Sequence, residues 1–168
     1  METIKTILDF SGYISTIIVL VAVITGAIIW IRGISPVLYR LGNGLAKRKI
    51  AIFAKGDNAV SLKSLLTDSK LFRQKNIFEI TSKEDIGKAE EASIYLVYWH
   101  DWADDISEIL NQKPDKCAMV VYAPYDKGKI PDEQMKNLDG KRHTAVTNFR
   151  GRLLNDIVTA MITTSYNY

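Results

Sequence analysis

Apolar residues form their longest uninterrupted run near the N-terminus. Between Phe10 and Ile31 the chain contains no charged side chain. A helix of that length covers about 33 Å, whereas the hydrocarbon core of a bilayer is about 30 Å thick. A helix buried in a soluble core is usually shorter and carries a polar stripe, for which this run has too few polar residues. The pattern therefore predicts a transmembrane helix over 10–31, after a short extracytoplasmic N-terminus over 1–9.

The flanks of this run are unlike those of a cleaved signal peptide. Glu2 and Asp9 precede it in place of a basic leader, and no small-residue cleavage site follows it. We therefore expect the segment to stay attached to the chain. Ser35 and Pro36 have the pattern of a helix cap with proline at the first helical position, which predicts a short amphipathic helix within a juxtamembrane linker over 32–48. Its expected apolar face is formed by Val37, Leu38, Leu41 and Leu45.

From position 49 onward, short apolar runs alternate with segments of helical periodicity. The runs predict five strands, at 49–54, 76–80, 93–99, 117–123 and 143–148. A turn is expected at Gly56-Asp57, followed by a helix that runs to about Phe72. Further helices are expected at 82–92, 103–112, 131–138 and from about 150 onward. This alternation predicts one α/β domain over 49–168, with a three-layer, mostly parallel five-stranded sheet of flavodoxin-like or TIR-like topology.

Ligands of such sheets bind outside the carboxyl ends of the strands, where the strand order reverses. The predicted strands place three segments at that edge, namely Lys55 to Asn58, Trp99 to Asp105 and Ala123 to Gly128. Any binding or catalytic chemistry of the α/β domain is expected there.

Charge is divided unevenly along the chain. The first 48 residues contain five basic and two acidic residues, whereas the remaining 120 contain 17 of each. The positive-inside rule then places the α/β domain in the cytoplasm and the N-terminus outside, with the basic residues near anionic lipid headgroups. Balanced charge after position 48 argues against direct nucleic-acid binding, and the lone Cys117 suits a reducing compartment. The basic residues beside the expected span are Arg32, Arg40, Lys47, Arg48 and Lys49.

Small residues recur on one face of the expected span. Such residues allow helices to pack closely in lipid, so this face predicts self-association, although small residues are also common in membrane helices in general. A single helix cannot line a channel, so a pore would need a ring of chains. The face is formed by Gly12, Ser15, Val19, Ala22 and Gly26.

Several known site chemistries are incomplete at the predicted edge. A phosphorelay receiver needs an acidic pair after the first strand and a lysine after the fifth, but only Asp57 and a possible acceptor, Asp101, are present. A phosphate-binding loop needs more glycines than Gly56 alone, and a zinc site needs more ligands than one Cys and two His. We therefore expect no metal and no cofactor.

The segment YWHDWADDISEIL, 98–110, resembles the stretch of TIR domains that carries a Trp-Cys-x-x-Glu pattern. The resemblance implies that Glu108 would be the residue that acts on NAD in the enzymatic members. Trp102 lies six positions before Glu108 instead of four, and the Cys is missing. The alternative interpretation is a solvated helix face with acids near its N-terminus, formed by Asp104, Asp105 and Glu108.

Asn137 and His143 have a spacing that resembles the Arg/Asn and His motif of HEPN ribonucleases. That resemblance implies RNA cleavage by His143. Gly140 interrupts the segment, and the predicted fold is α/β instead of all-α, so an exposed turn is the alternative interpretation.

Length, a single N-terminal span, a compact second part and the spacing from Asn137 to His143 together resemble the small membrane-anchored accessory proteins of type VI-B CRISPR systems. The resemblance implies an antiviral effector of the bacterial inner membrane. Such an effector would form a homo-oligomeric ring, make the membrane permeable and act alongside an RNA-guided RNA nuclease. Two alternatives stay open, a membrane-tethered NAD hydrolase and a sensor of a nucleotide second messenger.

Overall fold

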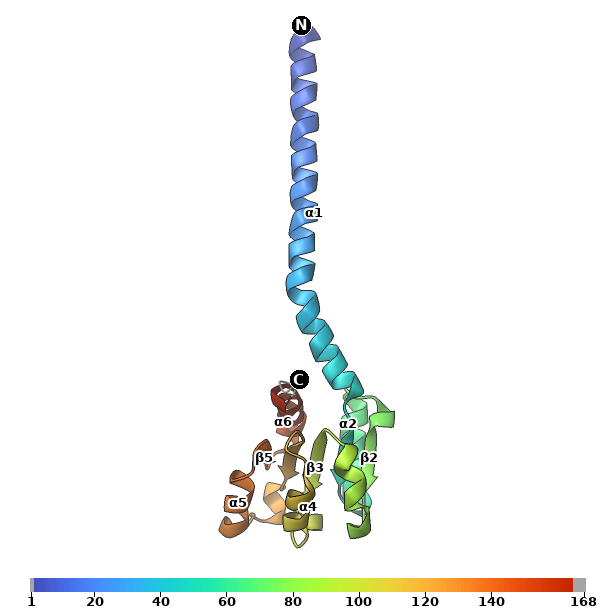
Figure 1. Ribbon diagram of the computed structural model, residues 1–168, viewed down its shortest axis with the longest axis vertical. Helices are drawn as coiled ribbons and strands as arrows, with labels where there is room; N and C mark the ends of the chain where they lie inside the picture. The colour runs from blue at the N-terminus through green and yellow to red at the C-terminus, as the bar shows by residue number, and fades with distance from the viewer. Residues whose placement is uncertain (1, 165–168) are drawn as a thin grey trace. The chain divides into compact units, whose positions relative to one another are not determined.

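Helix α1, Glu2–Lys47, contains the apolar run of the chain (Figure 1). Within it, Phe10–Pro36 is long and apolar enough to cross a membrane, with a mean hydropathy of 2.7. None of its most apolar part is buried, whereas a helix in a soluble core would be mostly buried. The predicted apolar helix is confirmed as a candidate membrane span by its length and composition.

The computed structural model describes residues 2–164, and at positions 4–9, 37, 40, 41 and 43–46 it describes the backbone alone. The chain divides into two units, Met1–Leu41 and Gly42–Tyr168. The predicted apolar face of the linker falls largely on positions without described side chains, as does Arg40.

Pro36 lies inside α1 and does not start a new helix. The prediction that Ser35 caps a separate linker helix is therefore wrong. Proline removes one backbone hydrogen bond and crowds the preceding turn, but helical sequence continues on both sides, and helices in membranes tolerate proline. Local cap chemistry did not outweigh the helical preference of the flanking residues.

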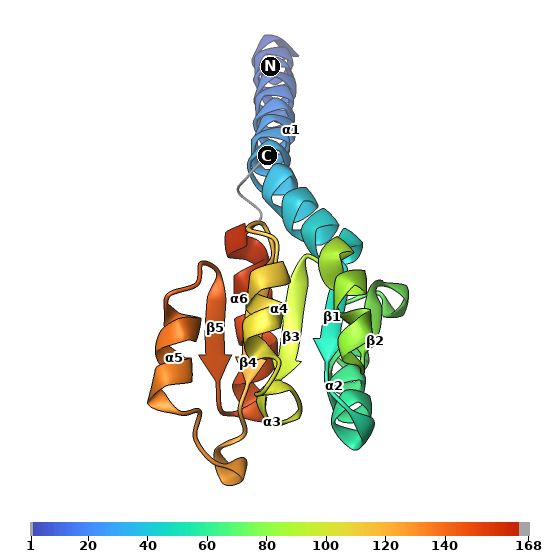
Figure 2. The same ribbon diagram turned by 60° about the horizontal axis from the view of Figure 1, so that its bottom comes forward.

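The second unit is built on a five-stranded sheet with the order β2-β1-β3-β4-β5, in which every neighbouring pair is parallel (Figure 2). This is the flavodoxin-like order, and it confirms the predicted fold class. The strands are β1 Ile50–Phe53, β2 Ile77–Ile80, β3 Ile94–Tyr98, β4 Ala118–Tyr122 and β5 Thr144–Thr147.

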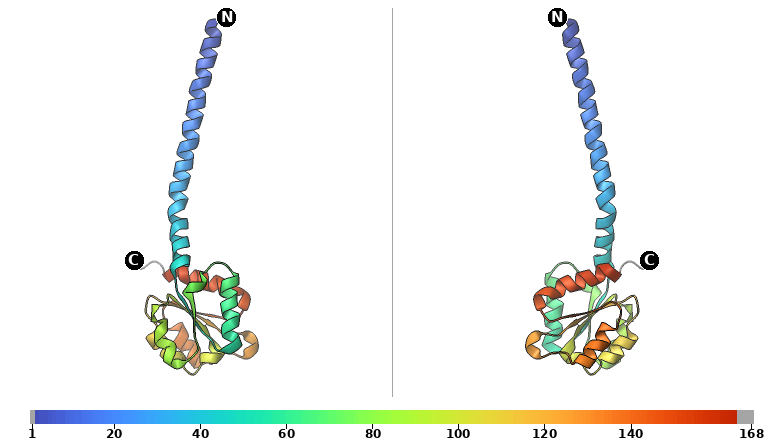
Figure 3. Two further views of the ribbon diagram at one scale, coloured as in Figure 1. Left: turned by 90° about the vertical axis from the view of Figure 1, so that its right-hand side faces the viewer. Right: turned by 90° about the vertical axis from the view of Figure 1, so that its left-hand side faces the viewer.

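The three central strands are apolar throughout because helices cover both of their faces. Every residue of β1, β3 and β4 is buried. Helices α2, Gly56–Asp68, and α6, Arg150–Thr163, pack on one face, where Leu62 and Ile157 contact the sheet core. The opposite face is covered by η2 Lys83–Glu91, α3 Trp99–Trp102, α4 Ile106–Gln112 and α5 Asp132–Asp139 (Figure 3).

Three helices differ from the prediction in their type or their bounds. The expected helix after Ser82 forms as the 3-10 helix η2, and Ser82 makes no side-chain cap bond. The helix expected from Ala103 begins at Ile106, after the separate turn α3. Helix α2 already begins at Gly56, where a turn was expected, and it ends before Lys70, whose φ of 56° is incompatible with a continuing right-handed helix. Two further 3-10 turns are η1 Gln74–Asn76 and η3 Tyr125–Lys127.

Candidate functional site

The strand order reverses between β1 and β3, so the loops after these strands diverge to opposite faces of the sheet. In this fold that point is the usual ligand crevice. Two of the three predicted edge segments, Lys55 to Asn58 and Trp99 to Asp105, meet here, since β1 and β3 are paired in register. The third, Ala123 to Gly128, follows the next strand, β4.

Asp101 bridges the two loops at the crevice. Its Oδ2 accepts a hydrogen bond from the backbone N–H of Lys55 at 2.7 Å. The side-chain amide of Asn58 donates to both carboxylate oxygens, at 3.1 and 3.2 Å. Lys55 is the N-cap residue of α2 and has no side-chain cap bond of its own. The Asp101 carboxylate therefore lies beside the N-terminus of α2, where nucleotide-binding sheets hold a phosphate.

Lys55 and Trp102 close the crevice from the other side. The ammonium of Lys55 lies 4.8 Å from the centre of the Trp102 ring, and that ring meets Phe53 edge-on at 5.5 Å. Trp102 is only 1% exposed, and its Nε1 is buried without a hydrogen-bond partner among the described residues. The positions that a small ligand would use between β1 and β3 are thus occupied by the protein's own carboxylate, ammonium and indole.

On the α2 and α6 side of the same edge lie two tyrosines and an arginine. The rings of Tyr98 and Tyr122 pack edge-to-face at 5.8 Å. Burial, followed by the charge of Asp101, raises the pKa of Tyr98, and burial likewise raises the pKa of Tyr122 while Arg150 opposes it. Arg150 at the start of α6 donates to the backbone oxygen of Ser61 in α2 at 2.9 Å. This contact links the two helices across the carboxyl edge.

Glu108 lies on α4 in an exposed ion pair. Its carboxylate accepts from Lys83 at 2.8 Å, and Lys83 also bonds Asp105 at 3.1 Å. Hydrogen bonds to Glu108 and then Asp105 raise the pKa of Lys83. Gln112 donates to the same carboxylate at 3.3 Å. The arrangement matches the solvated helix face that the sequence left as an alternative, and a role of Glu108 in NAD chemistry stays a prediction.

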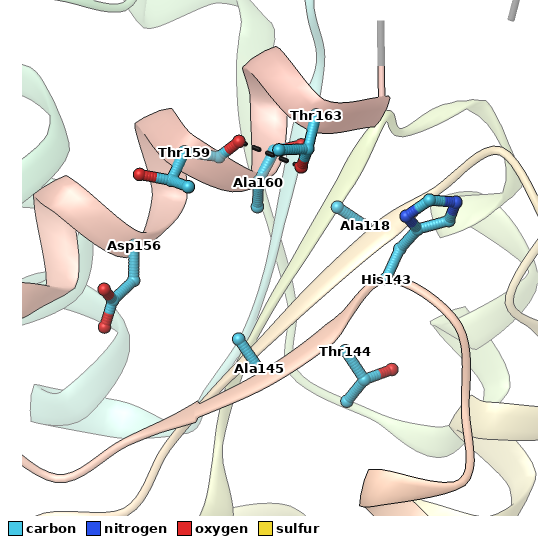
Figure 4. Close-up of a pocket in the computed structure, with 8 residues that line it drawn as sticks. All are labelled: Ala118, His143, Thr144, Ala145, Asp156, Thr159, Ala160 and Thr163. Carbon is cyan, nitrogen blue, oxygen red and sulfur yellow. Dashed lines mark hydrogen bonds between the residues drawn. The ribbon is translucent and has the colours of Figure 1, made fainter. Parts of the chain in front are cut away.

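Asn137 and His143 belong to different surroundings. Asn137 is exposed on α5, whereas His143 follows that helix with a φ of 56° and lines a shallow groove beside α6 (Figure 4). Helices α5 and α6 cover opposite faces of the sheet. Asn137 does not line the groove, so the HEPN-like spacing gives no shared pocket here.

The groove beside α6 has a volume of about 200 Å³ and was not expected from the sequence. It lies against β5, which is an edge strand of the sheet, at its amino end. Asp156, Thr159 and Thr163 line its helical side, and their helical spacing in α6 is the signal that could have located it. The rest of its lining is Ala118, His143, Thr144, Ala145 and Ala160.

The basic residues expected at the membrane surface have mixed surroundings. Arg32 and Lys47 are exposed, while Arg40 lies outside the described side chains. Arg48 donates to Thr164 Oγ1 at 2.9 Å, and Lys49 pairs with Glu91. The two residues nearest β1 therefore brace the α/β unit in addition to any contact with lipid.

The small-residue face of α1 coincides in part with an apolar groove along the helix. Ala22 and Gly26 lie in the groove, and a side chain added at Gly26 would meet nothing within 4 Å. Ser15 and Thr16 bond the backbone oxygen of Gly12 at 3.3 and 2.8 Å, which satisfies their hydroxyls inside the helix. Gly12, Ser15 and Val19 lie outside the groove. Its lining is Ile17, Ile18, Val21, Ala22, Thr25, Gly26 and Ile29.

Among the described residues, no group of three or more His, Cys, Asp or Glu side chains could hold a metal ion. Comparisons with models of known protein families, with curated proteins and with solved structures found no match to this chain.

Proposed function

We propose that this protein is a membrane-anchored effector whose spanning helices self-associate and form or gate a pore. The observation that carries the proposal is the apolar groove at Ala22 and Gly26 on a helix whose most apolar part is not buried. In lipid there is little hydrophobic drive between helices, so close packing at small residues supplies much of the association energy.

A pore requires several copies, because one helix cannot line a channel. The hydroxyls of Ser15 and Thr16 bond within the helix and so need no partner from a neighbouring chain. Self-association of the spanning helices can therefore depend on close packing at the groove. The α/β unit would lie in the cytoplasm, where the positive-inside rule favours the basic flank of the span.

Self-association is tested by measuring the mass of the full chain in detergent and in lipid nanodiscs. We expect oligomers for the wild type and a shift toward monomers for Ala22→Leu and Gly26→Leu, since both changes fill the groove. Val23→Leu is the matched control, because Val23 is exposed on the helix outside the groove. A strictly monomeric wild type at high concentration would contradict the proposal.

Pore activity is tested separately in cells with a potential-sensitive dye. Expression of the full chain should depolarise the membrane, and the groove-filling variants should do so less than Val23→Leu. A chain that lacks residues 1–34 should have no effect. If the wild type is oligomeric but its expression leaves the membrane potential unchanged, pore formation is contradicted. Self-association of the spans would then stand without a pore.

The link to RNA-targeting immunity stays a prediction that depends on resemblance of architecture. Its test is co-expression with an RNA-guided RNA nuclease during phage infection. Protection greater than that given by the nuclease alone would support the link, and equal protection would contradict it.

A second candidate function, a sensor of a nucleotide second messenger, is favoured by two exposed aromatic side chains at the carboxyl edge. Tyr125 is 70% exposed and Phe149 is 61% exposed, and each follows one of the paired strands β4 and β5. Aromatic faces stack on bases, and cations bind phosphates. The nearby cations are Lys127 and Lys129, which follow β4, and Arg152 in the first turn of α6.

The sensor is tested by thermal-shift screening of the full chain with cyclic nucleotides. Ligand binding to the folded state raises the melting temperature. Loss of that rise in Tyr125→Ala and Phe149→Ala, but not in Val60→Ala, would support the site. Val60 is the matched control because it is an exposed apolar residue of α2.

A further inference from the structure

The fold separates charges that balance over residues 49–168. The segments that precede the five strands form the amino-terminal edge of the sheet, and those that follow the strands form the carboxyl edge. The first set, residue 49 and the segments 68–76, 88–93, 112–117 and 139–143, contains nine basic and five acidic residues. The second set, 54–58, 81–85, 99–105, 123–133 and 148–152, contains six basic and nine acidic residues.

Many of the basic side chains at the amino-terminal edge are exposed and available. Within the part of the chain that the structure describes, six exposed basic residues of this set take part in no salt bridge. Of the acids at this edge, Glu91 is already paired with Lys49. The remaining acids reduce the positive charge of the edge without cancelling it. The six available residues are Lys70, Arg73, Lys75, Lys116, Lys141 and Arg142.

An exposed apolar side chain lies among these cations. Leu71 is 45% exposed, whereas the next residue, Phe72, is buried in the core beside α2. The left-handed backbone of Lys70 and a hydrogen bond from the Leu71 N–H to Ser69 Oγ at 3.3 Å fix the turn that carries it. An apolar residue flanked by Lys and Arg suits the boundary between headgroups and acyl chains.

A short stretch of chain connects this edge to the candidate span. Lys49 directly precedes β1, so the amino-terminal edge is joined to the candidate span by the short segment 37–49. A short tether gives an intramolecular contact a high effective concentration. Electrostatic attraction between exposed charges extends about 10 Å at 0.1 M salt, so a tethered basic edge near an anionic surface is attracted to it.

We propose that the amino-terminal edge of the sheet docks on anionic phospholipid headgroups of the membrane that α1 crosses. Lys70, Arg73 and Lys75 contact the phosphates around an inserted Leu71, and the basic residues of the next strand entries extend the contact. The inference rests on the proposed membrane anchorage and goes beyond self-association of the spans. Docking leaves the carboxyl edge, with Tyr125 and Phe149, open to the cytoplasm.

The test places a polarity-sensitive dye on the full chain at Leu71→Cys and, as the opposite-edge control, at Tyr125→Cys. Cys117 is 2% exposed and should stay unlabelled. The labelled proteins are reconstituted in vesicles of phosphatidylcholine alone or mixed with phosphatidylglycerol. We expect the dye at position 71 to shift to the blue in the anionic vesicles and to return in high salt, while the dye at position 125 stays unchanged.

Charge reversal gives a second, independent readout. Each basic residue near an anionic surface contributes about a fivefold factor to binding, so K70E, R73E and K75E combined should abolish the shift at position 71. The matched control is K127E with K129E at the carboxyl edge, which should leave the shift unchanged. Flotation of each protein with phosphatidylcholine vesicles reports anchorage by α1 on its own.

The outcomes separate the two proposals. A chain that fails to float with any vesicle overturns the anchorage and the docking together. A chain that floats but gives the same spectrum at position 71 in both lipids overturns the docking alone. A blue shift at both positions also overturns the docking. So does a shift at position 71 that is absent with anionic vesicles and appears only when RNA is added to the protein. A shift confined to position 71, anionic lipid and low salt supports it.

Discussion

The Asp101 carboxylate accepts the backbone N–H of Lys55 at 2.7 Å, across the point where the strand order of the sheet reverses. These residues are far apart in the sequence, and the contact brings the loop after β3 to the start of α2. Where related sheets leave a crevice for a ligand, this protein has an internal hydrogen bond. The carboxyl edge between β1 and β3 is therefore held closed by its own side chains.

Removal of this carboxylate should destabilise the α/β unit. In Asp101→Ala the Lys55 N–H and the Asn58 amide lose a charged acceptor. A hydrogen bond to a charged group contributes about 1.5–3 kcal/mol, and less where it is exposed, as the bond from Lys55 is. We expect a lower melting temperature for the full chain in detergent. Asp104→Ala is the matched control, because Asp104 is exposed in the same loop. Equal melting temperatures for the two variants would contradict the bridging role.

The sequence predicted the neighbourhood of this contact but not the contact. Apolar runs located all five strands, and their alternation with helices gave the parallel sheet and hence the meeting of 55–58 with 99–105. Which side chain accepts which N–H depends on the turn α3, which begins at Trp99 where a longer strand was expected. Hydrogen bonds between distant segments follow from such details of backbone path, which residue patterns do not carry.

Other features were missed for related reasons. Balanced charge after position 48 suggested a neutral domain, yet the fold places an excess of basic residues at one edge of the sheet and an excess of acidic residues at the other. That separation appears only when loops are sorted by the end of the strand they join. Pro36 suggested a helix start, but a single lost hydrogen bond did not interrupt α1.

The Lys83 and Glu108 pair should contribute little to stability and nothing to pore activity. Both side chains are more than a third exposed, and solvent screens such pairs. Glu108→Ala and Lys83→Met should therefore each lower the melting temperature slightly, and the double variant should be no worse than their sum. Membrane depolarisation should equal that of the wild type.

The same Glu108 variant also tests the enzymatic alternative. NAD is measured in cells that express the wild type or Glu108→Ala, with Glu84→Ala as a control on the surface of η2. NAD loss that occurs with the wild type and with Glu84→Ala but disappears in Glu108→Ala would support NAD hydrolysis. NAD loss that persists in Glu108→Ala would exclude Glu108 as the catalytic carboxylate.

Cys117 should be inert to thiol reagents while the protein is folded. Burial raises the pKa of its thiol from 9.0 to about 12, so the reactive thiolate is scarce in the folded state. Folding favours the neutral thiol. Its contribution to the free energy of unfolding is therefore fully present below about pH 9 and is lost as the pH rises toward 12. Labelling with iodoacetamide near pH 8.5 should be slow, and fast after unfolding in denaturant. The exposed thiol of Leu71→Cys gives the fast reference, and equal rates for both would contradict the prediction.

Lys113 should be a structural lysine, in contrast to its exposed neighbour Lys116. Its ammonium donates to the backbone oxygens of Cys117 at 2.7 Å and Arg142 at 3.2 Å, which links the end of α4 to the entries of β4 and β5. Burial lowers the pKa of Lys113, so the contacts hold a partly desolvated charge. Lys113→Met leaves those carbonyls without their donor, and we expect a loss of about 1–3 kcal/mol in the free energy of unfolding.

Lys116→Met is the control for this change, because Lys116 is exposed and takes part in no salt bridge among the described residues. Denaturant unfolding of the full chain in detergent should distinguish the two variants, and hydrogen exchange should increase at the first residues of β4 and β5 only in Lys113→Met. The docking proposal predicts the opposite ranking for lipid contact, in which Lys116 matters and Lys113 does not. A Lys113 variant as stable as wild type would show that the edge of the sheet holds its geometry without this cation.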